Sequence, residues 1–287
     1  WSKKGEFLVG GANEHLGYSA DMSEDGNCIV LGGNAGNNDN AWIYIWDGTS
    51  WVNRGASGTN PAFTRTDSDQ FGKSCAINND GTVIAFGVFE ADIADGARAD
   101  NTGIVQVYHW SGSAWVLKGT LTNKDTTDDT FGSAVSLSGD GKRLIVGAQD
   151  DSTFSNNNGR LYTFEYNGST WVRREPFTSI GTGSGVYDDT EIGRVRTAVI
   201  SRDGSVIVSG ERGWNDGGVA DAGRVRVFSM PSNIKSIWGS NDDVNWTKIT
   251  TAPTREEATS NVAGLAFGYD DRLEFKNLDN PNYYKYH

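Results

Sequence analysis

The acidic residues of one short segment have the types and spacing of a cation site. Asp125, Asp128 and Asp129 lie within five consecutive positions. Calcium takes about six to eight oxygen ligands, and three converging carboxylates could supply several of them. The cluster is therefore a candidate calcium site, or a contact for a cationic partner. The alternative interpretation is an acidic, solvated loop that binds nothing.

A lone tryptophan marks a second candidate site. Trp214 falls in a stretch of Gly, Asn and Asp residues, 213–218, where no repeated pattern demands an aromatic ring. An indole offers a flat apolar face together with a polar N–H edge, which suits a sugar ring. We expect Trp214 and the neighbouring Asp216 to contact a ligand.

Two asparagines match a modification pattern. Asn167 and Asn245 each begin an Asn-x-Ser/Thr sequence, the acceptor for N-glycosylation. Asn167 is followed by a glycine, however, and Asn-Gly is also a strong hairpin signal. The turn alone accounts for that sequence.

Motifs of catalysis are missing from the sequence. It contains no GxSxG, no HExxH and no phosphate-binding loop, and it has only three histidines. Cys28 and Cys75 form neither a CxxC motif nor a disulfide framework, and whether they pair stays open. We predict that the protein is not an enzyme, with action on a polysaccharide the least favoured of the functions considered.

The segments that must position these residues form an internal repeat. Each copy opens with an apolar residue and a glycine, reaches an Asp-Gly about nine residues later, and continues into a β-branched run that ends in glycine. Asp-Gly between apolar runs predicts a tight hairpin. The four copies open at Leu16-Gly17, Phe71-Gly72, Phe131-Gly132 and Ile192-Gly193.

A third and a fourth strand complete each copy. The third alternates, with a mostly aromatic face at period two, as in Trp42, Tyr44 and Trp46. His109 takes the place of Ile45 and Glu165 in this strand, which makes it a tolerated strand position. A second Gly turn then leads to a fourth strand that begins at equivalent tryptophans, which we expect to be largely buried: Trp51, Trp115 and Trp171.

Four antiparallel strands of about 60 residues cannot bury both faces of their sheet alone, so the copies must stack. Stacking around an axis predicts an all-β fold, a β-propeller of four-stranded antiparallel blades, and a linear β array is the alternative. Residues 1–8 match a fourth strand with no repeat before it. Either this strand closes the last blade, or it belongs to a blade outside this sequence, which we favour.

Phe131-Gly132 through Asp140-Gly141, followed by Val146-Gly147-Ala148, resembles the FG-GAP repeat of integrin-α-type β-propellers. The ending Gly-Ser-Thr-Trp171 is similar to a subtype found in surface proteins of aquatic microbes and their large viruses. The resemblance covers residues 1–230 and implies adhesion or ligand binding. Integrin-type repeats hold calcium in a DxDxDG-like loop, which here is shortened to turns such as Ser138–Gly141, so these aspartates are expected to form turns.

The segment 231–287 follows a different pattern. Ile237–Asp243, Asn245-Trp246-Thr247 and Tyr283–Tyr286 are similar to part of a discoidin-like module, which implies a partial β-sandwich-like tail. The alternative is a fifth Trp-ended hairpin. We therefore divide the chain into repeats at 1–230 and a β-rich segment at 231–287.

Antiparallel order predicts where the charge lies. Turns one-to-two and three-to-four share one end of a blade, and the longer connections share the other. The long connections hold 18 of the 37 acidic residues and only 4 of the 25 basic ones: 34–40, 57–70, 88–102, 122–130, 148–158, 178–191 and 211–222. We expect one strongly acidic end.

Composition narrows the function classes. The 287 residues carry a net charge of −12, which opposes binding to nucleic-acid backbones, and the apolar runs are too short to insert in a membrane. The leading hypothesis is an adhesion module, extracellular or on a virion or cell surface, that binds a glycan or a surface protein through the acidic end. The alternative is a structural repeat protein that self-associates in a fibre, spike or surface layer.

Overall fold

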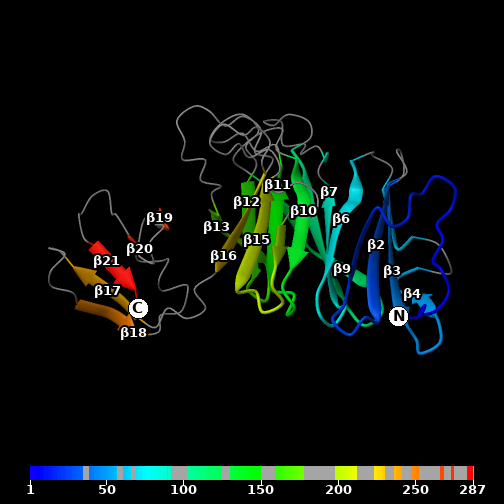
Figure 1. Ribbon diagram of the computed structural model, residues 1–287, viewed down its shortest axis with the longest axis horizontal. Coiled ribbons are helices and arrows are strands. Elements are labelled where there is room, and N and C mark those ends of the chain that lie inside the picture. Colours follow the sequence, from blue (N-terminus) through cyan, green and yellow to red (C-terminus); the bar gives the residue numbers. More distant parts are fainter. Residues whose placement is uncertain are drawn as a thin grey trace. The chain divides into compact units, whose positions relative to one another are not determined.

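The computed structural model describes strands throughout the chain (Figure 1). It describes residues 1–34, 39–56, 61–65, 69–88, 90–91, 102–123, 130–149, 160–177, 198–211, 223–229, 236–240, 247–251, 266–267, 273–274 and 283–286. The described residues include no helix, and none therefore that is long and apolar enough to span a membrane. The chain divides into two compact units, Trp1–Ser229 and Met230–His287.

The first unit consists of four sheets, here called blades 1 to 4, and each is an antiparallel meander. Blade 1 is β1 (Ser19–Met22), β2 (Cys28–Asn34), β3 (Asp39–Trp46) and β4 (Trp51–Asn53). Blade 2 is β6 (Phe71–Ile77), β7 (Val83–Val88), β8 (Ile104–Trp110) and β9 (Trp115–Thr122). Blade 3 is β10 (Phe131–Leu137), β11 (Arg143–Ala148), β12 (Arg160–Tyr166) and β13 (Trp171–Phe177). Blade 4 is β14 (Ala198–Ile200), β15 (Val206–Glu211) and β16 (Arg224–Ser229).

The outer strand of blade 1 departs from the expected pattern. It is divided, because a short strand, β5 (Phe63–Arg65), pairs with the start of β3 while β4 pairs with its end. Backbone hydrogen bonds from Arg54 N to Ile43 O and from Ala62 N to Ala41 O continue the pairing on either side of the interruption. The predicted repeat of four antiparallel strands is otherwise confirmed in blades 1 to 3.

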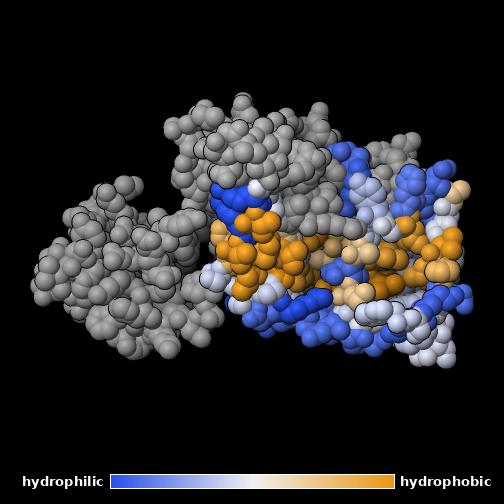
Figure 2. Space-filling model, in the orientation of Figure 1, coloured by the Kyte–Doolittle hydropathy of each residue, from blue (hydrophilic) through white to orange (hydrophobic). Residues whose placement is uncertain are grey.

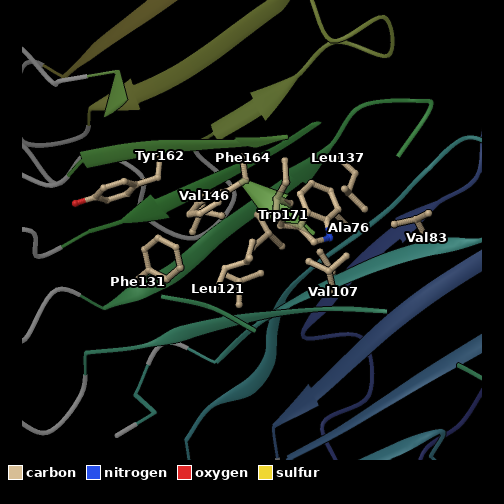
Figure 3. Close-up of a cluster of buried hydrophobic side chains, with 14 of the residues drawn as sticks. Ala76, Val83, Val107, Leu121, Phe131, Leu137, Val146, Tyr162, Phe164 and Trp171 are labelled. Carbon is tan, nitrogen blue, oxygen red and sulfur yellow. The ribbon is translucent and has the colours of Figure 1, made fainter. Parts of the chain in front are cut away.

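The blades pack face to face through two hydrophobic clusters. One joins blades 1 and 2 around Val30, Phe71 and Phe86. The other joins blades 2 and 3 around Val107, Leu144 and Tyr162, and Figure 3 shows its side chains between the two sheets. The aromatic stripe contributes to these interfaces in blades 2 and 3, through Tyr108, Tyr162 and Phe164. In blade 1 the residues of β3 in the cluster are Ala41 and Ile43, on the opposite side of the strand from Trp42 and Tyr44.

Glycines allow the inner parts of adjacent blades to touch. A Cβ on Gly32 would lie 1.8 Å from Gly72 O, and a Cβ on Gly87 would lie 1.9 Å from Gly132 O. Gly72 and Gly132 themselves have φ of +79° and +98°, a region that side chains rarely adopt. Both glycines of the repeat motif are thus required by close contact between backbones.

A ladder of backbone hydrogen bonds links the Asp-Gly turns of successive blades. The residues before the aspartates are joined by Glu24 N to Asn79 O, Asn79 N to Gly139 O, and Gly139 N to Arg202 O. The Arg202 guanidinium then reaches Met22 O at 3.2 Å and Ile77 O at 3.4 Å. Because blade 4 contacts blades 1 and 2 in this way, the four inner strands surround an axis, in agreement with a propeller rather than a linear array.

The second unit is described only as strands. β17 (Ser236–Ser240) pairs with β18 (Thr247–Thr251) and with β21 (Tyr283–Tyr286), and β19 (Ala266–Phe267) pairs with β20 (Leu273–Glu274). The discoidin-like and fifth-hairpin interpretations of this unit both stay predictions.

Candidate functional site

At the Asp-Gly end of the blades, the polar side chains of each turn form hydrogen bonds within that turn. In blade 4, Ser201 Oγ donates to Asp203 Oδ1 at 2.5 Å, and Ser205 N donates to the same oxygen at 3.0 Å. Val206 N donates to Ser201 Oγ at 2.9 Å. The same arrangement recurs at Ser23 with Asp25, Asn78 with Asp80, and Ser138 with Asp140.

These hydrogen bonds define the chemistry of the turn carboxylates. The side-chain hydrogen bond from Ser201, with those from Ser205, lowers the pKa of Asp203 to about 2. The side-chain hydrogen bond from Ser23 likewise lowers the pKa of Asp25. Their oxygens are engaged with neighbouring donors in the same turn, which agrees with a turn-forming role and does not suit a calcium ion that needs many ligands.

The turns between the third and fourth strands, at the same end, also form their hydrogen bonds locally. Asn167 Oδ1 accepts hydrogen bonds from Ser169 N at 3.0 Å and Thr170 N at 2.9 Å. Asp47 does the same in blade 1, and Ser111 in blade 2. Asn167 therefore has the same turn-stabilising role as Asp47 and Ser111 in the other blades. Its glycosylation stays a prediction.

The strand ends opposite these turns converge at one end of the unit. The pairs Asn34 with Asp39, Val88 with Ile104, Ala148 with Arg160, and Glu211 with Arg224 close the second and third strands of the four blades there. The connections between the second and third strands begin and end at these pairs. Strand pairing thus sets the common location of their end points.

Buried polar groups hold this end together. The Asp39 side chain is fully buried, and its Oδ2 accepts a hydrogen bond from Phe71 N at 2.9 Å. Phe131 N donates to Thr102 O at 3.1 Å in the next interface. The first residue of each Phe-Gly motif is thereby tied to the blade before it.

Two arginines contact a buried tyrosine in blade 3. Arg160 is buried, and its Nη1 donates to Tyr162 Oη at 3.3 Å. The Arg173 guanidinium lies 4.6 Å from the centroid of the Tyr162 ring. Sequence reasoning missed this pair, since its only signal is an arginine at a strand start where blade 2 has an isoleucine.

The predicted ligand contacts fall in connections between described strands. Trp214 and Asp216 lie between β15 and β16, and the cluster of Asp125, Asp128 and Asp129 lies between β9 and β10. All five residues, and Asn245 in the second unit, lie outside the described residues. Within the part of the chain that is described, no group of three or more His, Cys, Asp or Glu side chains could hold a metal ion.

Histidine and cysteine side chains are packed in the sheets. The His109 ring lies 5.0 Å from the Tyr166 ring between blades 2 and 3, and burial lowers its pKa. Cys28 and Cys75 are thiols and form no disulfide, and burial raises the pKa of Cys28. These positions resemble packing sites.

The three equivalent tryptophans, expected to be largely buried, differ in degree. Trp171 is 7% exposed, and Trp51 and Trp115 are partly buried. Trp51 Nε1 donates to Lys4 O at 3.0 Å and Trp115 Nε1 donates to Arg54 O at 2.9 Å, which holds each indole at the blade margin. Trp171 Nε1 has no acceptor among the described residues, and its ring packs in the cluster that joins blades 2 and 3.

The N-terminal segment contributes a feature that sequence reasoning placed only in part. Lys4 Nζ lies 5.4 Å from the centroid of the Trp51 ring, as the Arg54 guanidinium lies 5.7 Å from that of Trp115. The signal was present as a repeated Trp-x-x-x-Gly, at 1–5, 51–55 and 115–119. No strand pairing or backbone hydrogen bond joins residues 1–8 to β16 within the described chain.

Some solved structures are similar to this chain at low sequence identity. No curated protein matches the sequence. TolB from Acinetobacter baumannii is similar in structure at 10% identity and a TM-score of 0.44, over 93% of this chain and 53% of TolB. The β-propeller domain of the Trilobed protease from Pyrococcus furiosus is similar at 9% identity and a TM-score of 0.42, over 91% of this chain and 64% of that one. The chain thus spans about half to two thirds of these structures.

One segment of the sequence also matches the model of a protein family. Residues 115–164, from β9 to β12, match the FG-GAP repeat. The same sheet pattern occurs on either side of this stretch, with the same glycines at the same contacts. The chain is an FG-GAP-like β-propeller repeat protein.

Proposed function

We propose that this protein is a non-catalytic binding module, extracellular or on a virion or cell surface, that takes a glycan or a surface protein at the long-connection end of its blades. The observation that carries the proposal is topological. The paired ends of the second and third strands of all four blades lie at the end opposite the short turns, and each short turn forms its hydrogen bonds within itself. Loops that vary on a rigid scaffold are where binding residues concentrate.

The distribution of acidic residues also supports a binding site at the long-connection end. The long connections hold 18 of the 37 acidic residues. Clustered carboxylates of one sign raise the local concentration of cations or basic groups and steer their approach. A ligand with basic groups, or one bound through calcium, is complementary to this negative charge.

Glycan-array and protein-binding measurements on the full chain test the proposal. Trp214→Ala and Asp216→Asn should weaken binding at least tenfold, because they remove the ring and the carboxylate expected to contact the ligand. Ser113→Ala, in the exposed β8–β9 turn at the opposite end, is the matched control and should bind as the parent does. Equal loss in both kinds of variant, or binding unchanged by the Trp214 and Asp216 variants, would contradict a site at this end.

Calcium is a separate proposal for the cluster of Asp125, Asp128 and Asp129. An ion that binds only the folded state must raise the melting temperature as its concentration passes the dissociation constant. The shift should be present in the parent and lost in a variant with all three aspartates changed to asparagine. No shift up to about 10 mM calcium, above the range typical of extracellular modules, would exclude calcium there.

A further inference from the structure

Blade 4 exposes an apolar face that the other blades bury. The end face is defined here as Val199, Val208, Val225 and Val227, which are 54%, 38%, 68% and 65% exposed. Figure 2 shows apolar surface gathered over β15 and β16. Exposed apolar patches on a rigid sheet are typical of interaction surfaces.

The repeat shows what kind of surface this is. By strand register, Val227 corresponds to Ile43, Val107 and Thr163 in blades 1 to 3, and these are 0%, 0% and 4% exposed. Val225 corresponds likewise to three buried residues: Ala41, Val105 and Leu161. In each earlier blade this face packs against the next blade, so the end face continues an interface that already occurs three times in the chain.

The complementary face lies on blade 1. Met22 is 54% exposed, whereas the residues at its position in the following blades are 0% to 3% exposed: Ile77, Leu137 and Ile200. Those three pack against the blade before them. Blade 1 therefore leaves the Met22 part of its face uncovered, while Trp42 and Tyr44 on the same face are already buried within the chain.

The N-terminal segment contributes to this face of blade 1. In the interface of blades 1 and 2, Arg54 Nη1 donates to Gly81 O at 2.9 Å, and Gly55 lies against the Trp115 ring. Lys4 Nζ donates to Gly26 O at 2.9 Å, and Gly5 lies against the Trp51 ring. Residues 1–5 thus stand on blade 1 where the outer strand of a preceding blade would stand.

We propose that the end face binds a second copy of this chain, with blade 1 of one copy packed on blade 4 of the other. Each copy supplies what the other needs: blade 4 supplies three valine-bearing strands, and blade 1 supplies Met22 and residues 1–5. The contact is head to tail, because it joins two different surfaces. Contacts of this kind form rings or open chains rather than closed two-fold dimers.

Sedimentation velocity over a range of protein concentrations tests the association. The parent should form dimers and longer species as its concentration rises, and Val227→Glu should remain monomeric, because a carboxylate on the end face would be buried against apolar residues. Val116→Glu is the matched control, since Val116 is 40% exposed on β9 and lies outside both faces, and it should associate as the parent does. A parent that stays monomeric up to millimolar concentration, or a Val227→Glu variant that associates normally, would overturn the proposal.

Cross-linking tests the register and separates two copies from closure within one. Val172 pairs with Glu165 in blade 3, and the equivalent positions are Ser2 and Ser229. Mixing a Ser2→Cys variant with a Ser229→Cys variant should give a disulfide-linked dimer, while neither alone should. A Ser2→Cys/Ser229→Cys double variant that instead forms its disulfide within the monomer at low concentration would show that one chain closes on itself. That result would overturn the proposal that a second copy binds the end face.

Discussion

The interior interfaces and the end face of blade 4 have the same pattern and different environments. Val107 and Val227 occupy the same strand position, yet one is fully buried and the other is 65% exposed. The difference arises from the neighbour, since Val107 faces blade 3 and contributes to its core cluster. A repeat therefore specifies an interface on every blade, whether or not another blade packs against it.

The glycine contacts show how an interior interface is made specific. Gly87 meets the backbone of Gly132, and Ser74 Oγ donates to Gly132 O at 2.7 Å. Ser19 Oγ makes the equivalent hydrogen bond to Gly72 O at 2.5 Å. Apolar faces alone could slide past one another, but these close contacts define one register between blades.

The largest expected effect is on the interior. Phe86 is fully buried between blades 1 and 2, with ring centroids 4.8 Å from Phe71 and 5.5 Å from Phe63. Phe86→Ala should lower the free energy of unfolding by about 3–5 kcal/mol, through lost burial and the cavity that remains. Urea unfolding followed by tryptophan fluorescence measures this. A loss below about 1 kcal/mol would mean that the interface collapses around the cavity or contributes little to stability.

A matched pair of substitutions isolates the effect of the neighbour. Val107→Ala should cost about 2 kcal/mol, because it removes fully buried methyl groups. Val227→Ala, the same change at the same strand position, should fall within about 0.5 kcal/mol in dilute monomer. Unfolding at low protein concentration compares the two, and equal losses would show that strand position rather than the neighbouring blade determines the cost.

The smallest expected effect concerns the Asp-Gly turns, whose hydrogen bonds are alike in blade 4 and in the interior blades. The folded pKa of Asp203, about 2, lies below the value of about 3.9 for a free aspartate. Its hydrogen bonds therefore add stability that is present above pH 4 and is lost as the pH falls toward 2. Asp203→Asn should reduce stability slightly at pH 6 and leave it close to the parent at pH 2.5.

Urea unfolding of the parent and the Asp203→Asn variant at the two pH values measures this effect. Asp47, whose pKa is also about 2 through backbone hydrogen bonds from Ser50 and Thr49, offers a parallel substitution in blade 1. A difference from the parent that is the same at both pH values would show that the charge of the turn carboxylate is not what stabilises it.

Much of the fold could be predicted because its signals are local. Asp25-Gly26 and its three counterparts predict hairpins that the structure contains, with Gly26 at φ +64°. The alternation of Trp42, Tyr44 and Trp46 predicts one packed face, and Trp42 is fully buried. The candidate ligand contacts at Trp214 and Asp216 stay predictions, since loop residues follow no period that relates them to one another.

The sequence by itself determined the strands, the turns and the order of the meander, because hairpin geometry and period-two alternation act over a few residues. Only the tertiary structure decided which equivalent residues are buried. Met22 and Ile77 read alike in sequence, and Arg202 gives no local sign that it reaches Met22 O across 180 positions. Burial depends on which blade lies opposite, and that is a property of the packed molecule rather than of any one segment.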